Sequence, residues 1–269
     1  ANHPEQLEQH LLGLNRALAR LPDKSVVYAI VERLTAPYLQ EPSAQFAHAQ
    51  AALGLDDKVR AYQRLDEALA KRPGWEPAVL LKAQLLIQDA RAGEAADQLG
   101  EALARKPDDA NLRLAYARAL VANQRLEDSR EQFQRLLDAN PGDRDMLFAV
   151  ALLSFQLGDL DRAYELFERT LAAGHPEADG IRLNLGNIAE RRQDASAALR
   201  WYHQVMPGRQ YVDALTRIAV ILARGGQLDA ARMRLSQAEV DADERKRLQI
   251  VEAGLLRDAD RAPEALELL

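Results

Sequence analysis

The sequence predicts an all-α protein built as a solenoid of repeated helix-turn-helix units. Proline recurs about every 34 residues, at Pro73, Pro107, Pro141 and, one residue late, Pro176. Small residues recur in two columns that are always separated by the same interval. Hydrophobic residues make up 48% of the chain and aromatic residues only 5%, a usage typical of amphipathic helices rather than strands. Self-similarity at a fixed period of this length predicts stacked repeats.

The opening 41 residues fit the repeat less well and predict a helical pair of their own. One helix is expected from about Pro4 to Ala19 and another from about Ser25 to Ala36, separated by the segment 21–24. This pair could be a divergent repeat, a capping pair or the remainder of an earlier unit. We therefore predict an N-terminal region, 1–41, followed by about seven repeats over 42–269, of which the last is truncated.

Three columns of residues define the repeats. The first column is small and holds Ala49, Ala83, Ala117, Ala151, Gly186, Ala219 and Ala253. The second follows the first at a constant interval, is also small and holds Ala61, Ala95, Ser129, Ala163, Ala198, Ala231 and Ala265. The third, about one helical turn further on, is large and holds Leu65, Leu99, Phe133, Phe167, Tyr202, Leu235 and Leu269. Two helices can cross closely only where side chains are small, and a large side chain then fills the gap to the next unit.

These columns resemble the tetratricopeptide repeat, and the resemblance covers residues 42–269. The best unit spans 157–167 and reads Leu-Gly-Asp-Leu-Asp-Arg-Ala-Tyr-Glu-Leu-Phe, with Gly158 and Asp159 in the turn and Ala163 and Phe167 in the second helix. The resemblance implies a right-handed superhelical solenoid. It also implies that the first helix of each unit lines a concave groove to which partners bind.

The same resemblance indicates which side chains face that groove. In the first four units they are mostly apolar: Phe46, Gln50, Leu53, Leu80, Leu81, Gln84, Ile87, Leu114, Arg118, Val121, Phe148, Leu152 and Phe155. In the later units they are polar and rich in arginine: Asn184, Asn187, Glu190, Arg191, Thr216, Arg217, Arg224, Arg247 and Arg257. Such a groove would suit a partner segment with a hydrophobic stretch followed by acidic groups or a free carboxylate. Asparagine and arginine in a groove resemble the carboxylate-binding sites of the family.

No catalytic or metal-binding pattern is found in the chain. The five histidines, His3, His10, His48, His175 and His203, have no metal-ligand spacing, and we expect them at the surface or in loops. The chain has no motif for a serine nucleophile or for nucleotide binding. Acidic residues near helix starts, such as Asp56-Asp57, Asp108-Asp109 and Glu94, are explained by capping and by the helix dipole. We therefore expect neither an enzyme nor a cofactor, a metal or a small-molecule substrate.

The net charge of −6 argues against a nucleic-acid partner, because phosphate backbones require a basic excess. Cysteine is absent, which removes disulfides and thiol chemistry but leaves the compartment open. No apolar run approaches the length of a membrane-spanning helix, so a membrane contact would need an anchor outside this sequence. The sequence lacks an initiator methionine and ends within a predicted helix, and we interpret it as part of a longer protein.

The leading functional hypothesis is a non-catalytic scaffold or adaptor that binds proteins or peptides in the groove. The repeats also resemble those of Gram-negative envelope lipoproteins that deliver substrates to a periplasmic carboxy-terminal processing protease, which favours a periplasmic location. An alternative is the regulatory arm of a larger enzyme or assembly factor. Because a truncated solenoid exposes a hydrophobic end, a homodimer through terminal residues such as Leu266, Leu268 and Leu269 is a further hypothesis.

Overall fold

The structure, a computed structural model, describes residues 10, 11, 13 and 21–268. These residues form helices and short connections. The helices are α2 (Lys24–Thr35), the 3₁₀ turn η1 (Ala36–Tyr38), α3 (Pro42–Gly54), α4 (Lys58–Lys71), α5 (Glu76–Gln88), α6 (Ala92–Arg105), α7 (Ala110–Ala122), α8 (Leu126–Ala139), α9 (Arg144–Gln156), α10 (Leu160–Ala172), α11 (Ala178–Arg191), α12 (Ala195–Tyr202), α13 (Tyr211–Arg224), α14 (Leu228–Ser236), α15 (Ala242–Asp258) and α16 (Ala262–Leu268). No helix in this described part is both long and apolar enough to cross a membrane. The predicted all-α solenoid class is confirmed.

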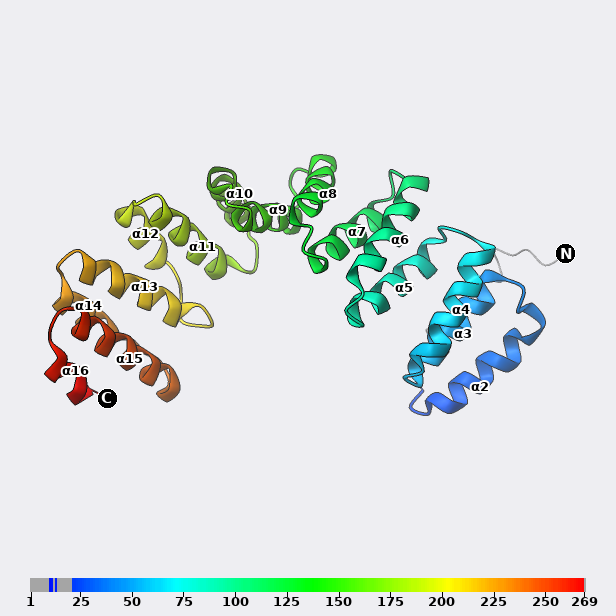
Figure 1. The fold of residues 1–269 in the computed structure, drawn as a ribbon, viewed down its shortest axis with the longest axis horizontal. Helices are drawn as coiled ribbons and strands as arrows, with labels where there is room; N and C mark the ends of the chain where they lie inside the picture. Colours follow the sequence, from blue (N-terminus) through cyan, green and yellow to red (C-terminus); the bar gives the residue numbers. More distant parts are fainter. Residues whose placement is uncertain (1–9, 12, 14–20, 269) are drawn as a thin grey trace. The chain divides into compact units, whose positions relative to one another are not determined.

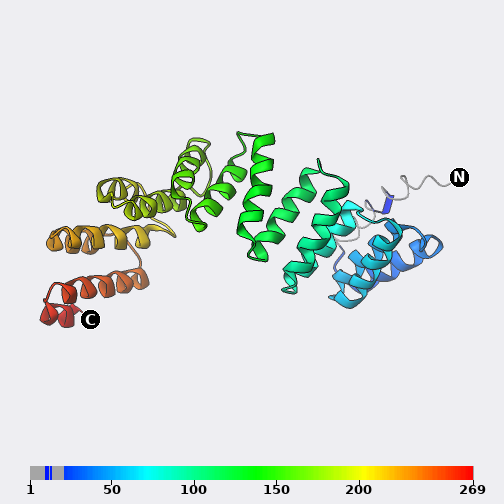
Figure 2. The same ribbon diagram turned by 45° about the horizontal axis from the view of Figure 1, so that its top comes forward.

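The chain divides into two compact units, which we call unit 1 (residues 1–139) and unit 2 (residues 140–269). In each unit, consecutive helices pair through a short turn, as α3 does with α4 in unit 1 and α9 with α10 in unit 2 (Figures 1 and 2). From α3 onward the described helices fall into seven such pairs. The division predicted between residues 41 and 42 stays a prediction.

Helix boundaries follow from local chemistry. Several helices begin after an aspartate whose carboxylate accepts a hydrogen bond from a free backbone N–H of the first turn. These aspartates are Asp23, Asp57, Asp109, Asp143, Asp159, Asp194 and Asp241. The predicted capping role of Asp57 and Asp109 is thereby confirmed. The recurring prolines 73, 107, 141 and 176 all lie between one pair and the next, where no helical N–H is required.

The small columns lie where the two helices of a pair cross. Every residue of both small columns is buried. The hydroxyl of Ser129 in α8 donates a hydrogen bond to the carbonyl oxygen of Ala117 in α7 over 2.9 Å, which shows how closely the two helices approach. The large column fills the space toward the next pair, with Leu65, Leu99 and Phe167 fully buried. The physical interpretation of the columns is therefore confirmed.

The N-terminal helix predicted over Ser25–Ala36 is present as α2, one residue earlier at each end. It packs on α3 through a small cluster of Val31, Ala44, Ala47 and Ala51, to which Leu11 also contributes. The other helix predicted there, Pro4 to Ala19, lies outside the described residues except for positions 10, 11 and 13. Leu269, predicted in the third column and at the hydrophobic end, also lies outside them.

The turn inside each pair needs one residue in the left-handed region. Glycine fills that position at Gly158 and Gly226, whose φ values are 81° and 78°. Ala90 holds the equivalent place between α5 and α6 with φ of 59°. The left-handed conformation costs a residue with a Cβ about 1 to 2 kcal/mol and costs glycine nothing. Glycine, however, loses more conformational entropy on folding. We expect Ala90→Gly to raise the free energy of unfolding by about 0.5 to 1 kcal/mol, measured by urea denaturation.

Gly158→Ala is the matched control for Ala90→Gly, because it makes the reverse change in an equivalent turn of the other unit. No side chain lies within 4 Å of a Cβ added there, so the effect is one of backbone conformation alone. It should lower the free energy of unfolding by about 1 kcal/mol. A loss of stability in Ala90→Gly would contradict the explanation.

Candidate functional site

The predicted groove residues lie on the first helices of the pairs, and all but one of the described set are at least partly exposed. The exception is Phe46, which is only 4% exposed. Its ring packs edge-on against Trp75 at a centroid distance of 5.3 Å, because the residue preceding α5 brings an indole over α3. Phe46 is therefore a core residue, and its assignment to a partner-binding surface is corrected.

In unit 1, first-helix side chains line a cavity of about 320 Å³ between α5 and α7. The predicted residues Leu80, Gln84, Ile87 and Arg118 belong to its lining, together with Ala83, Gln88, Leu99 and Ala115. The small residue Ala83 and the large residue Leu99 are buried beneath the surface. The repeat columns that hold the pair together thus also contribute to the cavity.

The unit 1 cavity combines an apolar lining with one free charge. Leu80 and Ile87 are partly buried and pack on the core below them. Arg118 is exposed, and no hydrogen bond or ion pair joins its guanidinium to another residue of the described chain. Such a site can take an apolar side chain and attract an acidic group beside it.

In unit 2, first-helix side chains line a polar cavity of about 520 Å³ between α9, α11 and α13. Its lining consists of Phe155, Asn187, Glu190, Arg191, Arg217 and Arg224. Three guanidinium groups face one carboxylate, so this cavity is cationic although the whole chain carries a net charge of −6. A negatively charged group is the ligand that such a site favours.

Glu190 is held by two partners at the base of the unit 2 cavity. Arg217 donates two hydrogen bonds to its carboxylate, Nε over 2.7 Å and Nη2 over 2.6 Å. The hydroxyl of buried Tyr202 lies 2.6 Å from the same carboxylate. Burial and the hydrogen bond to Glu190 raise the pKa of Tyr202, and the carboxylate raises the pKa of Arg217. Arg217 is thus a fixed, already neutralised part of the wall.

The Tyr202 hydroxyl also decides how Asn187 is oriented. Its oxygen lies 2.7 Å from Oδ1 of Asn187 and 2.6 Å from Oε1 of Glu190, both of which are acceptors. A phenol has one proton, and a carboxylate can only accept, so that proton goes to Glu190. With that proton on Glu190, the contact with Asn187 is a hydrogen bond only when the amide is turned so that its NH₂ group meets the phenol oxygen, an assignment set by the hydrogen-bond network.

Arg191 and Arg224 carry the charge that remains available in unit 2. The guanidinium of Arg191 lies over the ring of Phe155, with its carbon 4.7 Å from the ring centroid. A cation over an aromatic face keeps its N–H groups free at the edge. Arg224 is exposed and forms no hydrogen bond or ion pair with any residue in the described ranges.

Other predicted groove residues lie on first helices outside both cavities: Gln50, Leu53, Leu81, Leu114, Val121, Phe148, Leu152, Asn184, Thr216, Arg247 and Arg257. Sequence reasoning missed the role of Tyr202, which it placed only in the large column. A signal was present, since Tyr202 is the only member of that column with a polar group. A buried tyrosine hydroxyl usually needs a partner, which points to the first helix opposite.

One of the described histidines, His48, contradicts the expectation of surface or loop positions because it is buried within α3, whereas His175 lies in the loop after α10 as expected. His48 is 2% exposed and His175 is 8% exposed. The ring of His175 stacks on Phe148 at 4.5 Å between centroids, so its burial follows from an aromatic contact between α9 and the turn after α10. No group of three or more metal-ligating side chains occurs among residues 10, 11, 13 and 21–268.

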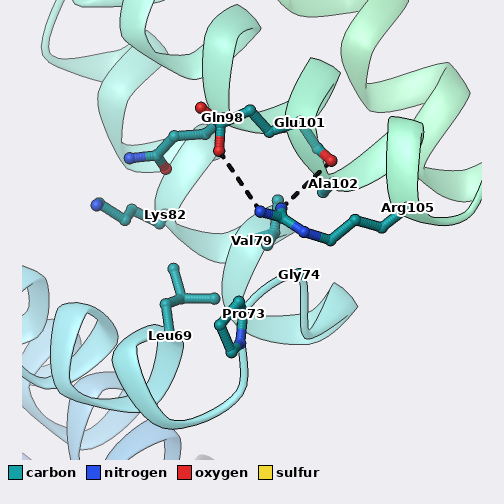
Figure 3. Close-up of a pocket in the computed structure, with 9 residues that line it drawn as sticks. All are labelled: Leu69, Pro73, Gly74, Val79, Lys82, Gln98, Glu101, Ala102 and Arg105. Carbon is teal, nitrogen blue, oxygen red and sulfur yellow. Dashed lines mark hydrogen bonds and ion pairs between the residues drawn. The ribbon is translucent and has the colours of Figure 1, made fainter.

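A further cavity of about 210 Å³ lies on the other side of unit 1, between α4, α5 and α6. Figure 3 shows Gln98 and Lys82 extending to one side of it and Arg105 crossing above Gly74. Lys82 is bound to Asp66 over 2.6 Å, and Arg105 donates to the carbonyl oxygen of Glu101 over 3.3 Å. Its cations are therefore already engaged, and none of the predicted groove residues lines it.

Comparison with known sequences supports the repeat assignment. Two models described as tetratricopeptide repeat match residues 86–153 and 148–205. Over 92 residues the chain is 33% identical to the TPR repeat-containing protein PA4667 of Pseudomonas aeruginosa. That match covers 34% of this chain and 16% of the relative, so the chain spans only a small part of the curated relative.

Solved structures show the same fold. A tetratricopeptide repeat protein from Parabacteroides merdae superposes with a TM-score of 0.60 at 16% identity, covering 84% of this chain and 90% of that one. The pilF protein of Pseudomonas aeruginosa gives 0.54 at 18% identity, covering 77% and 96%. PilW, a type IV pilus biogenesis factor, gives 0.53 at 20% identity, covering 77% and 97%. At these identities the likeness is one of fold alone.

Proposed function

Because this chain is a tetratricopeptide-repeat protein, we propose that it is a non-catalytic scaffold that binds partner proteins on the first-helix surfaces of its two units. One observation carries the proposal. In each unit, side chains expected from the repeat pattern to face a partner line a cavity, Leu80 and Arg118 in unit 1 and Phe155 and Arg191 in unit 2. Both cavities are open to a polypeptide and contain groups able to bind one.

The two cavities favour different parts of a partner. The unit 1 cavity offers Leu80 and Ile87 to an apolar side chain, whose burial stabilises a complex by about 25 cal/mol per Å² of apolar surface. The unit 2 cavity offers Arg191 and Arg224 to a carboxylate, either an acidic side chain or a chain terminus. A partner segment that contains both apolar and acidic residues meets both requirements.

The finer parts of the proposal concern the partner's identity. The resemblance of the repeats to envelope lipoproteins supports a periplasmic adaptor that brings substrates to a processing protease. The alternative is a regulatory arm of a larger enzyme or assembly factor. Two observations separate them: capture of a protease with its substrates supports the adaptor, and a catalytic domain encoded in the same reading frame as these repeats supports the arm.

The test compares partner capture by first-helix variants with capture by matched surface variants. Leu80→Glu with Ile87→Glu alters unit 1, and Arg191→Glu with Arg224→Glu alters unit 2. Each is expected to reduce the captured partner at least tenfold, because central side chains carry most of the binding energy of an interface. Loss through the unit 2 variant should shrink at high salt, since exposed charges are screened.

The controls make the same chemical changes on exposed second-helix or loop positions. Val59→Glu with Ala104→Glu matches the unit 1 variant, and Arg200→Glu with Arg209→Glu matches the unit 2 variant. Circular dichroism confirms that each variant is helical before capture. Equal capture by all folded variants would show that the first-helix surfaces do not bind the partner.

A further inference from the structure

A buried histidine joins α2 to the first helix pair. His48 of α3 is 2% exposed, and its Nε2 lies 2.5 Å from the hydroxyl oxygen of Thr35 at the end of α2. Thr35 is fully buried, and its hydroxyl also lies 2.7 Å from the carbonyl oxygen of Val31. The other ring nitrogen, Nδ1, is buried and has no hydrogen-bond partner among the described residues.

The hydroxyl of Thr35 has one proton, and this decides the state of the imidazole. The Val31 carbonyl can only accept, so the hydroxyl donates to it and in turn accepts from His48 Nε2–H. Nδ1 is then bare, an unpaired acceptor. If the Thr35 hydroxyl donated to Nε2 instead, the imidazole proton would be on Nδ1, as a buried N–H without an acceptor. A buried N–H without a partner is rarer in proteins than an unpaired acceptor. While α2 is docked, His48 of α3 is therefore neutral and carries its proton on Nε2.

Protonation of His48 is unfavourable while α2 is docked. It would place a new N–H at Nδ1, where no acceptor is in reach in the described part of the chain. From α4, the Arg64 guanidinium opposes a second positive charge, while Glu67 favours it; from α2, Glu32 favours it. The ring of Tyr28 in α2 contacts the imidazole edge-on at 6.0 Å between centroids, and α3 itself contains no other titratable residue. Burial and Arg64 together lower the pKa of His48 below its ordinary 6.5.

We propose that His48 is a pH-sensitive latch, whose protonation releases α2 from the first helix pair. The apolar contact that α2 would lose includes Val31 and the ring of Tyr28, which pack against the alanines at 44, 47 and 51 of α3. Release would expose this alanine face at the start of unit 1. The latch concerns the N-terminal edge of unit 1 and is independent of partner binding at the first-helix cavities.

The direction of the pH effect follows from linkage. The released state binds a proton with the ordinary pKa of 6.5, and the docked state binds it only at lower pH. The contribution of neutral His48 to the docking free energy of α2 is therefore fully present above pH 6.5 and is lost as the pH falls below that value. Between pH 7.5 and pH 5.5 the equilibrium constant for docking of α2 therefore falls, by at most about tenfold, the limit reached when docked His48 stays neutral.

Hydrogen exchange followed by mass spectrometry tests the latch. After correction for intrinsic exchange rates, protection of the α2 amides relative to those of α6 should fall from pH 7.5 to pH 5.5 in the unaltered chain, by up to about tenfold. His48→Gln is the control, because its side-chain amide keeps a donor for Thr35 but does not titrate. Its α2 protection should not change with pH. Unchanged protection in the unaltered chain, or an equal fall in His48→Gln, would overturn the proposal.

A measurement on the unaltered chain decides the matter if His48→Gln does not fold. NMR titration of the histidine rings gives the pKa of His48 directly, with the Nε2–H tautomer visible in the nitrogen shifts. We expect a pKa of His48 below 6.5. We also expect the amide resonances of α2 to lose their chemical-shift dispersion as the His48 ring is protonated. A pKa at or above 6.5, or titration with α2 still docked, would contradict the latch.

Discussion

Replacing Phe167 with alanine is expected to lower the free energy of unfolding by about 3 to 5 kcal/mol, as for other fully buried phenylalanines. Phe167 is completely buried in α10. Its ring lies 6.3 Å from that of Phe148 and 6.4 Å from that of Phe155, measured between centroids. The substitution would leave a cavity beneath two first-helix side chains of unit 2. Urea denaturation followed by circular dichroism measures the loss.

Phe167→Leu is the matched control for this prediction. Leucine occupies the same column at positions 65, 99 and 235, so the site geometry accepts it. We expect a loss below about 1.5 kcal/mol, in line with swaps that nearly conserve volume. Equal losses in Phe167→Leu and Phe167→Ala would show that the aromatic contacts, rather than the filled volume, stabilise unit 2.

Gly186→Ala is the second substitution with a large expected effect. A Cβ added to Gly186 would lie 2.3 Å from Cε1 and 2.6 Å from Cζ of the Tyr202 ring, distances at which something must move. Tyr202 is fully buried and hydrogen-bonded to Glu190, so its ring cannot yield easily. We expect a loss of about 1 to 3 kcal/mol from overpacking. Alanine's better helix propensity, about 1 kcal/mol, offsets only part of the strain.

A double-mutant cycle tests the cause of that loss. Gly186 and Tyr202 have the same separation in sequence as Ala83 and Leu99 of unit 1, where an alanine takes the place of the glycine and a leucine that of the tyrosine. Combining Gly186→Ala with Tyr202→Leu recreates the unit 1 pair. The double variant should be more stable than the sum of the single effects predicts, by at least about 1 kcal/mol. Additive effects would rule out a steric clash between the two positions.

Repetition explains why so much of the fold could be predicted. A single small residue says little, but the same small and large residues recurring at fixed spacing predict where helices cross. Local signals then placed the turns, through aspartate caps and glycines such as Gly158. The second helix of the N-terminal pair was predicted to within one residue from the interrupting segment 21–24, and the structure shows Asp23 capping it. These features depend on neighbours only a few residues away.

The candidate site was less predictable because its character depends on partners distant in the sequence. Glu190 and Arg217 are 27 residues apart, yet their ion pair removes Arg217 from the free charges of unit 2. Phe46 occupies a groove position by spacing, but Trp75 covers it. No periodicity reports either contact. Both arise where one helix pair meets the next.

The sequence by itself determined that this chain is a helical solenoid, since the fold follows from a repeated pattern of side-chain size. The groove positions on the first helix of each pair are what the resemblance to tetratricopeptide repeats implies. Only the tertiary structure decided which of those side chains are available and what state they are in. Within the described part of the chain it left Arg191 and Arg224 without an ion pair, enclosed Phe46, and buried His48 against Thr35. Availability and protonation are set by burial and by hydrogen-bond partners, which exist only once the helices have packed.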